Sequence, residues 1–181
     1  AGKYSPKMGD TIIGQVVDVT LMGWIMNINC AYRAMLVAKE ATSEFVRRDS
    51  DLTRFFSIGD YVCAGIVLVT SQKLVDLTTK GTGLRKLVGG RVIKVNPHKV
   101  PRIIGKQGSM ISLIKEMTGC KIVVGQNGLV WLQGNPRNEN LAVAAIKKVE
   151  EESLQSGLTD RMKTFLEEEA KNLKPEEKEA K

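Results

Sequence analysis

The chain has 181 residues, enough for one or two domains, and its 43% hydrophobic and 26% charged residues are typical of a globular protein. No apolar run approaches the ~18 residues of a membrane span, so we expect no membrane association. The three cysteines, Cys30, Cys63 and Cys120, are far apart and form no C-x-x-C pair. They favour buried thiols in a reducing, cytoplasmic compartment over a disulfide framework or a zinc site, and we expect no cofactor.

The net charge of +7 is concentrated in one part of the chain. Residues 81–135 hold nine Lys and Arg against one acidic residue, a net of +8, whereas residues 1–80 and 136–181 have nets of +1 and −2. Cations placed only for solubility would not gather in this way, but a surface that binds phosphate groups would. The central segment is therefore the first candidate for a nucleic-acid interface.

Residues 9–80 predict a small β-barrel. Apolar and β-branched residues mark five strands, at 10–20, 23–29, 33–38, 61–70 and 74–79. A long polar segment, residues 39–58, separates the third strand from the fourth. Five strands with a long third connection fit an OB-fold barrel, which commonly binds oligonucleotides on one face.

Trp24 can be interpreted in two ways. It could stack on a nucleic-acid base, but it shares a strand face with Met26 and Ile28, and this pattern favours packing in the core. On the same domain Arg33 and Lys73 are candidate phosphate contacts, although single exposed cations are more often only solvated. We keep both cations as candidate RNA-binding residues.

Three stretches of this domain resemble an RNA-binding S1 domain. They are Gly9-Asp10 at the first strand, Gly23 before the second, and residues 56–62 at the start of the fourth. The resemblance implies an S1-type barrel over residues 9–80. At two positions where S1 domains usually carry aromatic residues, this chain has Met22 and Ile25.

A second domain is expected after a glycine-rich crossover. Residues 81–90 contain four glycines and no predicted helix or strand. Residues 91–156 then predict, in order, a strand at 91–95, a short helix at 99–104, a helix ended by Gly119, strands at 121–124 and 129–132, and a helix at 136–156. Asn135 as cap and Pro136 at the first position begin that last helix.

The end of the chain predicts one more helix. Residues 160–172 have an amphipathic pattern, with Leu158 and Thr159 as staple and cap. The residues from 173 onward are nearly all charged and predict a disordered tail. We therefore expect residues 157–181 to form a C-terminal helix followed by a charged tail.

The stretch Gly105-Lys106-Gln107-Gly108 lies between two predicted helices in the most basic part of the chain. Glycines let the backbone turn tightly and approach a ligand closely, and the loop can offer N–H groups and one cation to phosphate oxygens. A P-loop or a dinucleotide-binding turn would need a different glycine spacing. A helix–helix turn without a ligand stays the alternative.

The residues around this loop, Ile-Ile-Gly-x-x-Gly-x-x-Ile, resemble the signature of KH domains, whose loop clamps the backbone of about four nucleotides. The order of the predicted elements is that of a type I KH domain, with a three-stranded sheet and three helices. The resemblance implies a set of RNA-binding residues on and before the loop. They are Lys99, Arg102, Ile104, Gly105, Lys106, Gln107 and Gly108.

A second stretch with the same glycine spacing is interpreted differently. Gly125-Gln126-Asn127-Gly128 joins two predicted strands, and Asn-Gly favours a hairpin turn because both residues tolerate a positive φ. We therefore expect Gly125, Asn127 and Gly128 to form a structural turn and not a second RNA site.

An S1-type barrel followed by one type I KH domain is similar to the RNA-binding cap subunit of the archaeal exosome. The resemblance implies a non-catalytic protein, present in three copies on a ring of RNase PH-like subunits. It would recruit single-stranded RNA for degradation from the 3′ end. Members of this family usually begin with a further N-terminal domain, so residues 1–8 are expected to be the remnant of a preceding segment.

Two other functions are weighed against this one. A transcription or translation factor could use the same two modules. A nuclease subunit would need clustered carboxylates for metal ions, but Asp10, Asp18, Asp60 and Asp76 are spread over the barrel. The one histidine, His98, lies beside a basic helix, where solvation or a phosphate contact is favoured over acid–base catalysis. We therefore expect no catalytic and no metal-binding residues.

Overall fold

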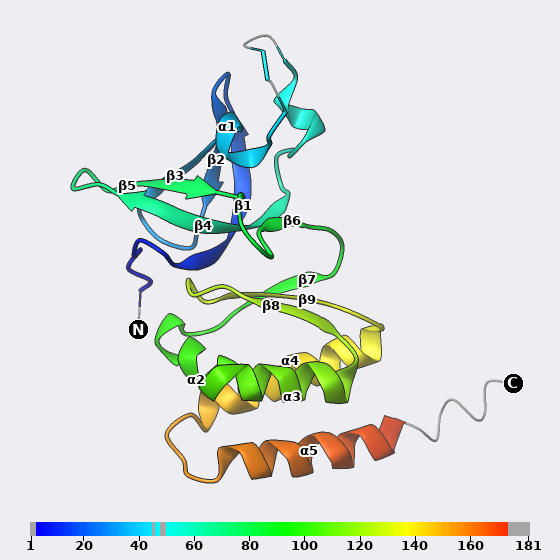
Figure 1. Cartoon of the computed structure of the whole chain (residues 1–181). Coiled ribbons are helices and arrows are strands. Elements are labelled where there is room, and N and C mark those ends of the chain that lie inside the picture. The colour runs from blue at the N-terminus through cyan, green and yellow to red at the C-terminus, as the bar shows by residue number, and fades with distance from the viewer. Residues whose placement is uncertain (1–2, 45, 48–49, 174–181) are drawn as a thin grey trace, which may run out of the picture. The chain divides into compact units, whose positions relative to one another are not determined.

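The computed structural model describes residues 3–44, 46–47 and 50–173, and they form two compact units. The first unit contains the chain up to Gly89 together with Val124–Leu129. The second contains Gly90–Val123 and the chain from Val130 onward. Figure 1 shows the strands of the first unit from blue to green and the helices of the second from green to red.

The first unit is a β-barrel whose five main strands close on themselves. The strands are β1 (Thr11–Val19), β2 (Gly23–Asn27), β3 (Arg33–Val37), β4 (Tyr61–Val69) and β5 (Leu74–Thr78). They are neighbours in the order β1–β2–β3–β5–β4, and pairing of β1 with β4 closes the barrel. Four of these five pairings are antiparallel, and β3–β5 is parallel. The predicted OB-type barrel is confirmed.

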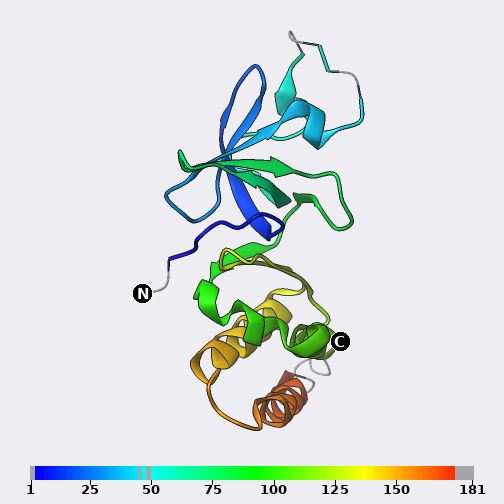
Figure 2. The same cartoon turned by 60° about the vertical axis from the view of Figure 1, so that its left-hand side comes forward.

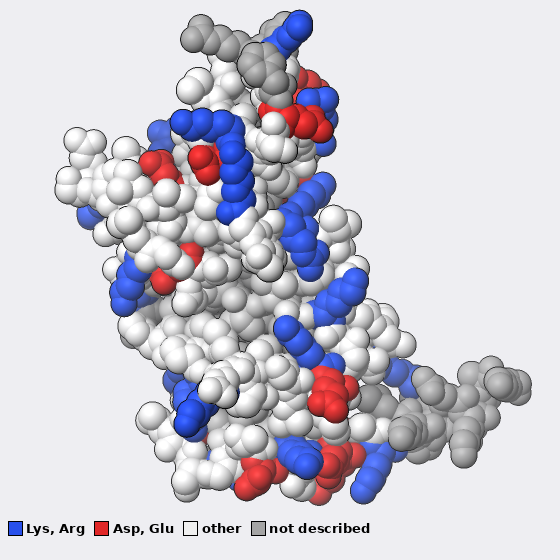
Figure 3. Space-filling model, viewed as in Figure 1, with Lys and Arg blue, Asp and Glu red and all other residues white. Residues whose placement is uncertain are grey.

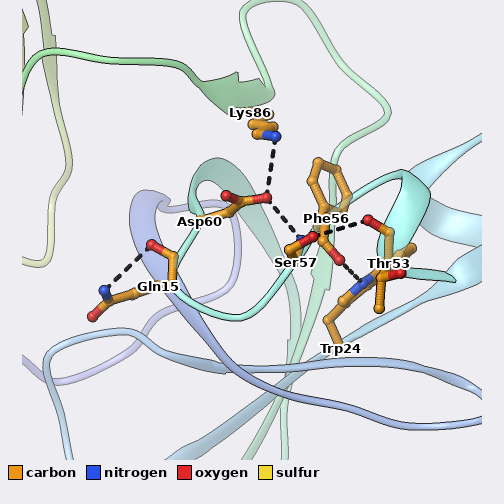
Figure 4. A network of polar contacts seen from close by, with 8 residues as sticks. Gln15, Trp24, Thr53, Phe56, Ser57, Asp60 and Lys86 are labelled. Atoms are coloured by element: carbon orange, nitrogen blue, oxygen red, sulfur yellow. Dashed lines mark hydrogen bonds and ion pairs between the residues drawn. The ribbon is translucent and has the colours of Figure 1, made fainter.

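The barrel core confirms the structural interpretation of Trp24. Its side chain is fully buried, and its Nε1–H donates a hydrogen bond of 2.9 Å to the carbonyl oxygen of Phe56 (Figure 4). The rings of Trp24 and Phe56 meet edge to face, with centroids 4.9 Å apart. Because the indole has an apolar neighbour and a partner for its N–H, it is fully satisfied inside the barrel and does not present a surface for bases.

The segment 81–90, predicted to lack secondary structure, contains a short strand, and that prediction is wrong. Strand β6 (Arg85–Leu87) pairs antiparallel with β4, where Leu87 lies opposite Tyr61. The Lys86 ammonium lies 3.1 Å from the Asp60 carboxylate (Figure 4). Three residues are too few to show an alternating pattern, and the strand forms because the edge of β4 offers unpaired backbone groups.

The polar segment between β3 and β4 also contains two short helical turns that the sequence pattern did not predict. They are α1 (Ala38–Ala41) and the 3-10 turn η1 (Leu52–Arg54). The side chain of Asp51 caps η1 by accepting a hydrogen bond from the backbone N–H of Thr53, and Leu52 is buried in the barrel core. One buried leucine in a polar stretch is enough to hold this turn on the barrel but gives no periodic signal.

Residues 3–8, expected to be only the remnant of a preceding segment, pack on the barrel. Tyr4 belongs to the barrel core, and its hydroxyl donates a hydrogen bond of 2.5 Å to the Asp10 carboxylate. Burial, and then the neighbouring carboxylate, raise the pKa of the Tyr4 hydroxyl well above its usual range. The protonated phenol is therefore the form that the fold favours.

The second unit is a three-stranded sheet with helices on one face. Its elements are β7 (Arg91–Lys94), η2 (Pro97–Lys99), α2 (Val100–Ile104), η3 (Lys106–Gly108), α3 (Ser109–Thr118), β8 (Lys121–Val124), β9 (Leu129–Gln133), α4 (Pro136–Glu151) and α5 (Leu158–Leu173). The strands lie in the order β7–β9–β8. Figures 1 and 2 show α3 and α4 against the sheet and α5 on their outer side. The predicted order of a type I KH domain is confirmed.

The helix ends show where local signals were sufficient and where they were not. Asn135 caps α4 as predicted, because its side chain accepts a hydrogen bond from the N–H of Arg137. The prediction that α4 continues to residue 156 is wrong, since it ends at Glu151 and its buried apolar stripe stops at Val149. The carbonyls beyond the helix bond instead to a side chain from α2, which no local pattern can indicate.

Helix α5 begins two residues before its predicted start. Leu158 lies inside the helix and is buried, so it does not act as a staple in front of it. The carbonyl of Gly157, which has a φ of 69°, accepts the first helical hydrogen bond from Arg161. The predicted charged tail falls mostly on residues 174–181, which lie outside the described part of the chain.

Candidate nucleic-acid interface

The loop between α2 and α3 has backbone conformations that favour glycine. Gly105 ends α2 at a φ of 76° and a ψ of 171°, and Gly108 precedes α3 at a φ of 75°. Gln107, between them, also has a positive φ of 55°. A Cβ on Gly105 would lie 2.7 Å from the backbone nitrogen of Met110, so this position excludes any side chain by space as well as by φ.

The middle residues of this loop are available to a ligand. Lys106 and Gln107 are exposed, and Ile104 before them is half-buried. Helix α3 begins directly after the loop, so the N–H groups of its first turn and the positive end of its dipole lie beside Lys106. The N–H groups of Gly108 and Ser109 already donate within the loop, to Gly105 and Lys106. The exposed cation and amide beside the positive end of a helix dipole still suit an anion such as a phosphate group.

The other two predicted RNA-binding cations near the loop have partners inside the second unit. The Lys99 ammonium donates to the carbonyl oxygen of Glu150 at 2.8 Å. The Arg102 guanidinium donates through Nε to the carbonyl of Ser153 at 2.8 Å. Both acceptors lie at the C-terminal end of α4 or just after it. The structure thus gives both cations hydrogen-bond partners at a helix end, although Arg102, like Lys106, is exposed.

Arg33 and Lys73 are brought together on the barrel although they are 40 positions apart in the sequence. The backbone N–H of Arg33 donates to the carbonyl of Lys73 at 3.3 Å, because β3 and β5 run parallel side by side. Both side chains are exposed. They belong to the first unit, whereas the loop at Gly105 belongs to the second.

The second glycine-spaced stretch forms a turn between β8 and β9. The N–H of Gly128 donates to the carbonyl of Gly125 at 3.0 Å, and Gly125 donates in turn to Leu129 at 2.8 Å. Asn and Gly both tolerate a positive φ, but of the two only Gly128 adopts one, at 84°. A backbone preference therefore does not explain Asn127.

The Asn127 amide is instead a buried connector within the first unit. Its side chain is 0% exposed, and its Oδ1 accepts from the N–H of Ile13 at 3.3 Å. Its Nδ2 donates to the carbonyls of Ile13 at 2.7 Å and Ile28 at 2.8 Å. The Asn29 side chain donates back to the Asn127 carbonyl at 2.9 Å. Since the contacts span about a hundred positions, no local sequence signal could have indicated this role.

Two neighbours complete this connection. The N–H of Gln126 donates to the Thr11 carbonyl at 2.9 Å, and the Gln126 side chain accepts from the Thr11 N–H at 2.7 Å. A Cβ on Gly125 would lie 2.8 Å from the Ile13 nitrogen. The glycine is therefore needed here for close approach of two backbones, which is a packing requirement and not a ligand site.

The charged side chains of the second unit are unevenly distributed. In the view of Figure 3, red and blue atoms are mixed along its lower edge, where α5 lies. The exposed side of α5 includes Asp160, Glu167 and Glu168. The segment of the loop and α2 contains no acidic residue between Arg91 and Lys115. Lys163 and Lys171 are exposed on α5 as well, so its charges are mixed. An RNA backbone would therefore meet a more favourable field at the loop than at α5.

Groups that could support catalysis are not assembled in the part of the chain that the structure describes. No group of three or more His, Cys, Asp or Glu residues there could hold a metal ion. Burial raises the pKa of the thiols of Cys30, Cys63 and Cys120, which makes a reactive thiolate unfavourable. None of the helices described is long and apolar enough to cross a membrane.

Comparison with known families agrees with the two units. Residues 3–68 match the S1 domain of RRP4, and residues 90–148 match the KH domain. The chain is 40% identical over 168 residues to the exosome complex component Rrp4 of Thermoplasma acidophilum, covering 93% of this chain and 70% of that protein. The chain belongs to the Rrp4 family of exosome components.

Other Rrp4 proteins extend the comparison. The Rrp4 of Pyrococcus abyssi is 43% identical over 169 residues, which cover 91% of this chain and 64% of that protein. The chain thus spans less than two thirds of the length of this relative. A solved structure with the provisional description of an exosome complex RNA-binding protein superposes with a TM-score of 0.83 at 36% identity, covering 95% of this chain and 99% of the other.

Proposed function

We propose that this Rrp4-family chain is a non-catalytic RNA-binding subunit of an exosome and that its KH-type loop holds single-stranded RNA. The observation that carries the proposal is the exposed loop Gly105–Gly108, with Lys106 and Gln107 free and α3 beginning beside them. Phosphates of the RNA backbone would accept hydrogen bonds from the loop and pair with Lys106. Such contacts carry no base identity, so the sequence preference is modest.

The barrel contributes phosphate contacts and not base stacking in this proposal. Ile25, Met35 and Asp76 are neighbours across β2, β3 and β5. They face outward, because side chains alternate along a strand and their neighbours Trp24 and Leu36 are buried. This row has no aromatic ring on which a base could stack. Arg33 and Lys73 at the end of the same strands are the cations that would steer the RNA.

The assembly that we propose follows from the family. The chain would cap a ring of RNase PH-like subunits, in three copies, and deliver unpaired RNA for degradation from the 3′ end. Tethering RNA at the ring raises its local concentration there without new chemistry. The three free thiols fit the reducing conditions of the cytoplasm, where we place the complex.

Binding of matched RNAs tests the first part of the proposal. The chain should bind a single-stranded RNA of mixed sequence more tightly than the same sequence as a duplex, since the loop clamps an unpaired backbone. Affinity should fall as salt rises, because each phosphate contact releases counterions. Equal affinity for both RNAs, or an affinity that is independent of salt, would contradict the proposal.

A decay assay tests the second part. Added to the catalytic ring, the chain should accelerate decay of long RNAs more than of RNAs too short to reach both the loop and the ring. Incubated alone with magnesium or manganese, the chain should leave RNA intact, because its described residues offer no cluster for the ions. Degradation by the chain alone would instead support a nuclease.

A further inference from the structure

The segment that leads into the RNA loop is hydrogen-bonded along its length to the end of α4. The contacts follow one another along the segment, from the end of β7 to the middle of α2. They are Lys147 Nζ to the Lys94 carbonyl (2.6 Å), the Asn96 N–H to Glu150 Oε2 (2.7 Å), Lys99 Nζ to the Glu150 carbonyl (2.8 Å), Arg102 Nε to the Ser153 carbonyl (2.8 Å) and Arg102 Nη2 to the Gln155 carbonyl (3.5 Å).

The acceptor of Lys99 is one of the last carbonyls of α4, and the acceptors of Arg102 follow just after the helix end. The last carbonyls of a helix have no partner within the helix, and they form the negative end of its dipole. Helix α4 ends at Glu151, and Ser153 after it is only 6% exposed. A carbonyl of a buried residue is costly to leave without a donor, and the guanidinium of Arg102, although exposed itself, supplies one in a part-buried hydrogen bond.

Helix α2 needs this support from outside. It has five residues, Val100–Ile104, and a helix of that length is not stable by itself. The loop that follows it contains three residues with positive φ. Fixing α2 on α4 holds Gly105 in place, so the loop is ordered before RNA arrives and binding costs less conformational entropy.

We propose that Lys99 and Arg102 are positioning residues of the RNA loop and not phosphate contacts. They tie α2 to the end of α4 and thereby order Gly105–Gly108, whereas Lys106 provides the charge that meets RNA. The inference rests on the proposed function where it is tested by RNA affinity. The test of loop order by hydrogen exchange does not depend on that function. It also separates two sets of cations that the basic sequence segment presents as one.

Hydrogen exchange of the full chain without RNA gives the structural readout. The amides of Gly105 and Gly108 donate to Pro101 and to Gly105 respectively, so they report on the order of the loop. Arg102→Met should make both exchange roughly tenfold faster, because a charge-assisted hydrogen bond is lost. Lys163→Met, which removes an exposed cation of α5, is the matched control and should leave both rates unchanged.

The salt dependence of RNA affinity gives the second readout, with a single-stranded RNA of mixed sequence as the probe. Lys106→Met should reduce the slope of log affinity against log salt by about 0.7, as expected for one lost contact to a single strand. Arg102→Met should lower affinity with an unchanged slope. Arg102→Lys keeps the charge but loses the planar donor geometry of the guanidinium. If Arg102 positions the loop, this variant should still lower RNA affinity and speed amide exchange.

The outcomes separate this inference from the proposed function. A reduced slope for Arg102→Met, or unchanged exchange in that variant, overturns the positioning role. Full affinity of Arg102→Lys together with wild-type exchange would also overturn it. If the unmodified chain binds no RNA, the proposed function fails, while the exchange rates still decide whether Lys99 and Arg102 order the loop.

Discussion

Two stretches of this chain share the spacing Gly-x-x-Gly, and the structure gives them opposite environments. At Gly105–Gly108 the two middle side chains are exposed and the loop joins two helices. At Gly125–Gly128 the amide of Asn127 is fully buried and replaces a backbone partner for the barrel. Glycine spacing alone therefore indicates a tight bend. Whether the bend binds a ligand depends on where its middle residues point.

The largest effect is expected from Asn127→Leu. The variant leaves the N–H and carbonyl of Ile13 and the carbonyl of Ile28 without their partner in a buried place. Each unpaired group costs about 1–3 kcal/mol, so we expect the barrel to lose roughly 3 kcal/mol or more. Urea unfolding followed by the fluorescence of Trp24 measures this loss, with the other tryptophan removed by Trp131→Phe in both parent and variant. A barrel as stable as the parent would show that the turn is not a connector.

A smaller effect, located in the other loop, is expected from Gly105→Ala. The added Cβ meets the Met110 backbone at 2.7 Å and opposes a positive φ, so we expect a loss of about 2 kcal/mol in the second unit. Gly108→Ala is the matched control, since a Cβ there meets nothing within 4 Å and only φ opposes it, at a cost of about 1 kcal/mol. Thermal unfolding measures both losses. Equal melting temperatures for the two variants would contradict the geometry.

Charge reversal in the exposed loop should affect binding without affecting the fold. Lys106→Asp with Gln107→Asp keeps both glycines, so the melting temperature should stay close to that of the parent. Two carboxylates beside the RNA backbone should lower affinity about tenfold or more, and similarly for different RNA sequences. Direct titration with two unrelated single-stranded RNAs measures both points. Unchanged affinity would remove Gly105–Gly108 from the RNA site.

The smallest effect is expected from Gln126→Ala. It tests whether burial sets the stability cost of losing a polar contact in the turn at Gly125–Gly128. Gln126 is exposed, although its side chain accepts a hydrogen bond from the Thr11 N–H. In Gln126→Ala water can replace the lost acceptor, so the barrel should lose less than about 1 kcal/mol. The same urea experiment applies. A loss as large as that of Asn127→Leu would mean that the polar contacts, and not burial, set the cost.

Much of the fold could be predicted from local signals. The five barrel strands follow from short stretches of apolar and β-branched residues, and the cap at Asn135 and the stop at Gly119 follow from backbone chemistry that acts within a few residues. The prediction was wrong where an element depends on a distant partner. Strand β6 exists because β4 has a free edge, and the end of α4 is shaped by Arg102.

The candidate site divides in the same way. A glycine-bounded bend with Lys106 and Gln107 in a basic segment can be predicted without the structure, because composition and spacing are properties of the chain alone. The partners of the nearby cations and the burial of Asn127 become visible only in the folded molecule. Hydrogen bonds between residues fifty or more than a hundred positions apart form only when folding brings them together, so the roles of Lys99, Arg102 and Asn127 are properties of the packed molecule.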